Sequence, residues 1–84
     1  MLDLFDEMDG RLKGILLRFP DSYEIIRPIQ KHVQHALINP SVNYEKYLNQ
    51  TRGRCMAAAV NYPELEDRLL AIVEKIDQEL NHFS

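Results

Sequence analysis

The stretch PELEDRLLAIVEKIDQELNHF, residues 63–83, decides the fold. Its apolar residues recur every three or four positions, which places them on one face of an α-helix. Pro63 is typical of a first helical position, and the acids that follow it suit the positive end of the helix dipole. A lone helix would leave its apolar face in water, so the rest of the chain must cover it. That face consists of Leu65, Leu69, Ile72, Val73, Ile76, Leu80 and Phe83.

Three more amphipathic segments precede this stretch. Residues 3–19, 22–38 and 43–61 each place apolar side chains at helical spacing. Pro28 interrupts the middle segment, because a proline beyond the first turn removes a helical hydrogen bond. That segment is then either a continuous but kinked helix or a separate turn followed by a helix that begins near Pro28. We expect the continuous helix, kinked at Pro28.

The four segments are joined by short loops, and none of them shows the alternation typical of a β-strand. The chain also contains no internal repeat and no low-complexity segment. The sequence therefore predicts an all-α fold in a single domain that spans residues 1–84. We expect a small bundle of about four amphipathic helices, at approximately 3–19, 22–38, 43–61 and 63–83.

The size of the chain favours self-association. A domain of 84 residues has a marginal core and often needs a staple or a partner. Cys55 is the one cysteine, so no intrachain disulfide can form. It also falls on the apolar face of residues 43–61, where a buried structural thiol is the usual state. A second copy of the chain is then the simplest source of extra burial, and we expect a homodimer.

The sequence also bears on location. No apolar run approaches the ~18 residues that a membrane span requires. The first residues are acidic, whereas a secretory signal begins with basic residues. We expect a chain that starts at Met1 and works in the cytoplasm without a membrane partner.

The net charge of −3 is unevenly distributed, with a basic middle between two acidic ends. The basic side chains could contact an anion or a nucleic acid. Alternatively, the arginines pair with acids of the last segment, for example Glu66 or Glu74. Because the whole chain is acidic, we favour pairing, and nucleic-acid binding is the alternative function. The candidate anion contacts are Arg27, Lys31, Lys46, Arg52 and Arg54.

No pattern in the sequence indicates catalysis or a cofactor. His32 and His35 are three residues apart and could meet one metal ion, but the spacing supplies no third ligand. The acidic stretch before Gly10 fails as a calcium loop, because it puts Phe5 and Leu16 where carboxylates are required. Phosphate-binding loops, nucleophile elbows and zinc motifs are absent. We therefore expect no enzymatic activity, no metal and no cofactor.

A few apolar residues lie off the buried face of their own helix. Leu17, Met56 and Leu70 each stand beside charged residues. Gly10 and Gly14 lie next to Leu17 on the helical wheel, where they are either glycines without a role or a shallow docking face. These five residues are the predicted partner or oligomer surface. The sequence thus favours a non-enzymatic protein–protein interaction module, a regulator or adaptor that acts as a homodimer.

Overall fold

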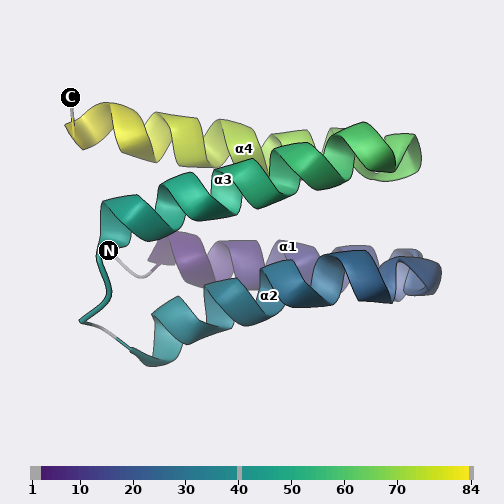
Figure 1. Ribbon diagram of the computed structural model, residues 1–84, viewed down its shortest axis with the longest axis horizontal. Coiled ribbons are helices and arrows are strands. Elements are labelled where there is room, and N and C mark those ends of the chain that lie inside the picture. The colour runs from purple at the N-terminus through teal and green to yellow at the C-terminus, as the bar shows by residue number, and fades with distance from the viewer. Residues whose placement is uncertain (1–2, 40, 84) are drawn as a thin grey trace.

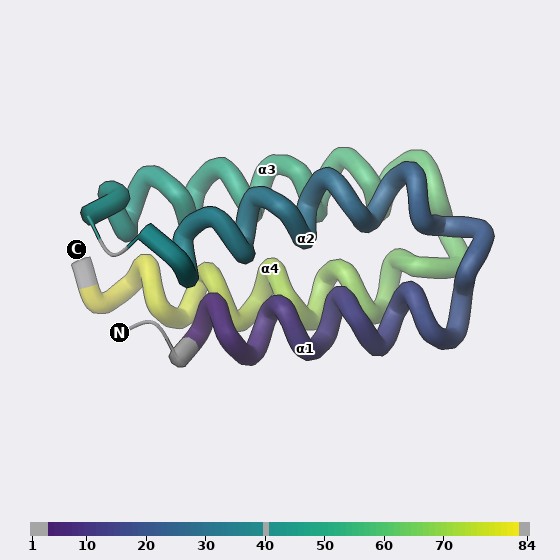
Figure 2. The backbone as a smooth tube through the Cα atoms, turned by 90° about the horizontal axis from the view of Figure 1, so that it is seen from below, coloured from purple at the N-terminus to yellow at the C-terminus, as the bar shows by residue number. Residues whose placement is uncertain are grey.

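The computed structural model describes residues 3–39 and 41–83, and over these residues the chain is an all-α bundle (Figure 1). The predicted fold class is therefore confirmed. Four α-helices run alternately up and down, with short 3₁₀ turns at the first and third junctions and after the last helix (Figure 2). The helices are α1 (Asp3–Arg18), α2 (Tyr23–Ile38), α3 (Tyr44–Asn61) and α4 (Glu66–Leu80), and the 3₁₀ turns are η1 (Pro20–Ser22), η2 (Pro63–Leu65) and η3 (Asn81–Phe83).

Prolines mark the start of two of the 3₁₀ turns. Pro20 opens η1 and Pro63 opens η2, at positions where the missing N–H would have had no partner. The predicted last helix, 63–83, is therefore subdivided, with α4 at its centre and a tighter turn at each end. At the start of α3, the Asn43 side chain accepts a hydrogen bond from the Lys46 N–H, which caps the helix.

Helix α2 passes through Pro28 without a break. The continuous helix predicted there is confirmed, and the alternative of a helix that begins near Pro28 is wrong. Pro28 is exposed, so the carbonyl of Glu24, which loses its helical donor, lies on a side of α2 that water can reach.

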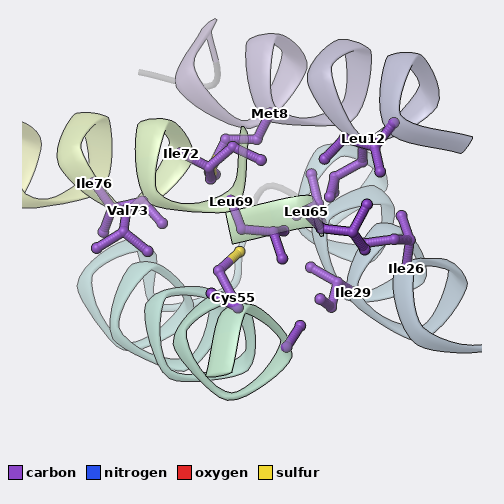
Figure 3. Close-up of a cluster of buried hydrophobic side chains, with 14 of the residues drawn as sticks. Met8, Leu12, Ile26, Ile29, Cys55, Leu65, Leu69, Ile72, Val73 and Ile76 are labelled. Atoms are coloured by element: carbon purple, nitrogen blue, oxygen red, sulfur yellow. The ribbon is translucent and has the colours of Figure 1, made fainter. Parts of the chain in front are cut away.

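The core lies between all four helices, and the apolar face of residues 63–83 supplies much of it (Figure 3). In this view Ile72 of α4 lies against Met8 of α1, and Leu69 of α4 points toward Cys55 of α3. Every one of these side chains is fully buried. The other large, fully buried side chains include Phe5, Leu12, Ile15, Ile26, Val33, Leu48, Leu65 and Ile76.

Each helix packs against two neighbours. Helix α1 lies beside α2 and α4, and α3 also lies beside α2 and α4, so α1 and α3 occupy opposite corners of the bundle. Small buried residues, Ala58 and Ala59, line the inner side of α3. Within the described residues, none of the helices combines the length and the apolarity needed to cross a membrane.

Candidate protein-interaction site

An apolar hollow of about 250 Å³ lies on the outer side of the α3–α4 pair. Helix α3 contributes Met56, Ala59 and Val60, and helix α4 contributes Glu66 and Leu70. Val60 is 77% exposed, and Leu70 and Met56 are 37% and 36% exposed. We call this hollow the α3–α4 groove. It brings large apolar side chains from two helices to one place on the surface.

The helical turn explains how these residues reach the surface. Leu70 follows the buried Leu69, and Met56 follows the buried Cys55, so a rotation of about 100° carries each side chain outward. Both were predicted as surface residues, and the structure places them side by side. Val60 was missed, although its position four residues after Met56 continues the same side of α3.

The groove has an acidic rim. Glu66 lines the groove four residues before Leu70, and Glu74 lies one helical turn after Leu70 on the same side of α4; both are exposed. Neither takes part in the ion pairs that the described residues form, which are Lys13–Asp9, Arg52–Asp77 and Lys75–Glu7.

One basic side chain faces α4 near the groove. The Nε atom of Arg52 lies 2.7 Å from Oδ1 of Asp77. The expected pairing of an arginine with the last segment is therefore present, but the partner is Asp77 rather than Glu66 or Glu74. The antiparallel alignment of α3 and α4 sets this choice, because Arg52 lies about a turn before Met56 on α3 while Asp77 lies beyond Leu70 on α4.

The other predicted surface residues lie on a separate helix. Gly10, Gly14 and Leu17 share the outer side of α1, at the corner of the bundle opposite α3. Leu17 is 85% exposed. A Cβ atom added to either glycine would meet no atom within 4 Å. We call these three residues the α1 surface, and nothing in the described fold packs against it.

The five candidate anion contacts are distributed over different sides of the bundle. Arg27 faces the α1–α2 side and Arg52 faces α4, whereas Arg54 lines the α2–α3 side. Lys31 on α2 and Lys46 on α3 are exposed. The two arginines that contact neighbouring side chains, Arg27 and Arg52, are the less available to an external anion.

A polar network that was not predicted from the sequence lies at the contact between α1 and α2. Asp9 is 7% exposed, and its Oδ1 accepts hydrogen bonds from the amides of Gln30 and Gln34 at 3.4 and 3.1 Å. Nη1 of Arg27 donates to the side-chain oxygens of both glutamines, and Lys13 lies 3.1 Å from Oδ2 of Asp9. The four-residue spacing of Gln30 and Gln34 was the available signal.

The two histidines lie against one tyrosine. The ring centroids of His32 and Tyr47 are 4.5 Å apart, and those of His35 and Tyr47 are 5.9 Å apart, both in stacked geometry. Burial lowers the pKa of His32, and the charge of Arg54 lowers it further, while a hydrogen bond to the Tyr47 backbone acts in the opposite direction. Within the described residues, no group of three or more potential ligands is placed to hold a metal ion.

Cys55 is buried in the core as expected. Burial raises the pKa of its thiol to about 12. The reactive thiolate is therefore a minor species at neutral pH, and the folded protein offers no cysteine nucleophile here.

Comparison with known proteins adds no relative. No protein-family model matches the chain, and neither a curated protein nor a solved structure is significantly similar to it.

Proposed function

We propose that the protein is a non-enzymatic protein–protein interaction module, a regulator or adaptor, that binds another protein chain in the α3–α4 groove. One observation carries this proposal: Met56, Val60 and Leu70, from two helices, expose apolar surface in a single hollow. The α1–α2 side of the bundle differs in kind, because the buried carboxylate of Asp9 and its amide partners lie there. Exposed apolar surface gathered in a groove is typical of interaction sites.

The free energy available from burying these apolar side chains is typical of residues that anchor an interface. Completing the burial of Val60 contributes on the order of 1–2 kcal/mol, and Met56 and Leu70 contribute less because each is already partly buried. A stable interface covers roughly 800 Å² on each partner. The solvent-accessible surface of the protein is 5219 Å². A partner must therefore cover the flanking outer sides of α3 and α4 as well as the groove.

Self-association, in the same proposal, uses the α1 surface. In an antiparallel pair of α1 helices related by a two-fold axis between Gly10 and Gly14, each glycine lies opposite the other glycine of the second copy. The same arrangement brings the exposed Asp6 of one copy opposite the exposed Arg18 of the other. The open glycines allow close approach, and Leu17 then packs across the second helix.

The experiment is site-specific photo-crosslinking in a lysate of the source cells. A diazirine side chain replaces Met56 in one variant and the exposed Lys31 in a control variant. We expect a discrete crosslinked partner from position 56 and none from position 31. Adding Leu70→Glu should abolish that product, whereas adding Leu17→Glu should leave it. The absence of any product at position 56, or equal products at both positions, would contradict the proposed groove.

The homodimer is tested separately by sedimentation equilibrium of the purified protein. We expect twice the chain mass at high concentration, and the mass of one chain for Leu17→Glu. A mass of one chain at every concentration would remove self-association and leave the groove unaffected.

A further inference from the structure

We propose that the segment bound in the α3–α4 groove is an amphipathic helix with basic residues beside its apolar anchors. This inference rests on the proposed function and adds the chemical kind of the partner. It is carried by three features of the groove: its apolar residues, its shape between two antiparallel helices, and the charge of its rim.

The apolar residues suit a helix. Met56 and Val60 are four residues apart on α3, which is about 6 Å along the helix axis. Leu70 faces them from α4 across the same hollow. An incoming helix that presents apolar side chains at i, i+3, i+4 and i+7 would set successive anchors at this spacing, as in other complexes in which a helix lies in a groove.

The rim suits positive charge. Glu66 and Glu74 lie on either side of Leu70 along α4, both are exposed, and neither belongs to an ion pair among the described residues. The nearby cation, Arg52, is already engaged by Asp77 at 2.7 Å. A lysine or arginine beside the anchors would therefore meet a carboxylate that has no ion-pair partner, and complementary charge of this kind favours the correct partner and faster association.

The same rim disfavours a second copy of this chain in the groove. A two-fold pairing through the groove about an axis that crosses the helices would place the outer side of α4 against the outer side of the other α4. The carboxylates of Glu66 and Glu74 would then face carboxylates, and like charges across an interface suppress such pairing. This α4-to-α4 pairing is thus disfavoured in the groove, and the proposal assigns self-association to the α1 surface.

The test uses two synthetic helical peptides that share their leucine positions. In one peptide all the remaining positions are lysine, and in the other peptide they are glutamate. Fluorescence anisotropy measures their binding to the wild-type protein at several salt concentrations. We expect the lysine peptide to bind at least tenfold more tightly than the glutamate peptide, with an affinity that falls as salt rises.

Variants distinguish peptide binding in the groove from nonspecific electrostatic attraction of the lysine peptide to an acidic protein. Glu66→Gln and Glu74→Gln should each weaken the binding of the lysine peptide about two- to fivefold and reduce the salt dependence of that binding. Glu24→Gln removes an equal charge from α2, which does not line the groove, and should change nothing. Leu70→Gln should weaken binding at every salt concentration. A thermal melt of each variant confirms that it is folded.

The outcomes are distinct. Equal binding of the two peptides, or equal effects of Glu24→Gln and Glu66→Gln, would overturn the basic-helix inference. Photo-crosslinking at position 56 would still support the groove in that case. Failure of the crosslink at position 56, with no effect of Leu70→Gln on the peptide, would overturn both.

Discussion

The imidazole ring of His32 stacks on the phenol ring of Tyr47, with the ring planes inclined by only 11°. This contact joins α2 to α3, the helices that connect the two halves of the bundle (Figure 1). The Nε2 atom of His32 is buried without a hydrogen-bond partner among the described residues. A proton on that nitrogen would have no acceptor and would stand near Arg54 and His35.

Stability should therefore fall in mild acid. The pKa of His32 lies below its ordinary value of 6.5 in the folded state, so the unfolded chain takes up the proton first as the pH falls. The stabilising effect of neutral His32 is complete above pH 6.5 and is lost as the pH falls below it. Urea denaturation from pH 7.5 to 5 should show this loss, and His32→Gln should reduce it. His82→Gln, in η3, serves as the control. If the unfolding free energy of His32→Gln depended on pH as steeply as that of the wild type, the loss could not be assigned to His32.

The open glycines should be sites of easy stabilisation. At concentrations where the protein is monomeric, Gly10→Ala and Gly14→Ala should each raise the free energy of unfolding by about 0.5–1 kcal/mol, because alanine is the better helix former and its Cβ meets no atom. Gly53→Ala is the matched control on α3, with equally open space, and should give the same gain. Thermal denaturation measures all three. A loss of stability at Gly10 or Gly14 would indicate a contact that the monomer does not contain.

Larger side chains at the glycines separate stability from assembly. Gly14→Gln should weaken the proposed homodimer, whereas Gly53→Gln should leave its dissociation constant unchanged. Sedimentation equilibrium provides the measurement. Equal effects of the two substitutions would exclude the α1 surface as the dimer contact.

The buried carboxylate of α1 should matter more than its ion pair. Asp9→Ala leaves the Gln30 and Gln34 amides without their acceptor and should cost about 1–3 kcal/mol of unfolding free energy. Lys13→Ala removes only the ion pair with Asp9, whose lysine is largely exposed, and should cost less than about 1 kcal/mol. Denaturant titration compares them. Similar costs would mean that the ion pair, rather than the amide network, stabilises the α1–α2 contact.

Two adjacent leucines should respond very differently to truncation. Leu69→Ala empties a fully buried position in the core and should cost about 2–5 kcal/mol. Leu70→Ala removes a side chain that is already partly in water and should cost about 1 kcal/mol or less. Comparable losses in a denaturant titration would show that Leu70 serves the fold and is not available to a partner.

The thiol of Cys55 should report opening of the bundle. With its pKa raised to about 12 by burial, it should react slowly with a disulfide reagent in the native protein at pH 8. The reaction should accelerate along the same denaturant transition that circular dichroism records. Fast labelling of the fully helical protein would show that the core admits reagent without unfolding.

Helical periodicity was enough to predict the four α-helices of this fold. The apolar faces located all four helices, and the prolines located the junctions at Pro20 and Pro63. What periodicity lacks is the alignment of one helix along another. Arg52 could be assigned to the acidic last segment by charge, but its pairing with Asp77 depends on the axial position of α3 relative to α4. The stacking of His32 on Tyr47 depends on the same kind of alignment between α2 and α3.

The candidate site was likewise predictable from the sequence only in part. Met56 and Leu70 were identifiable because each departs from the apolar face of its own helix. Their meeting in one groove was not, since it requires α3 and α4 to be placed side by side. Val60 escaped notice because a valine near a helix end is unremarkable until its exposure is known.

The up-and-down course of the chain has a consequence for its engineering. Helices α1 and α2 form one hairpin and α3 and α4 form another, and both close at the same end, through η1 and η2 (Figure 2). The first turn of α1 and the last turn of α4 lie together at the opposite end. The order of the hairpins along the chain is therefore not imposed by the packing. A circular permutant that reads α3, α4, α1, α2 should therefore build the same core.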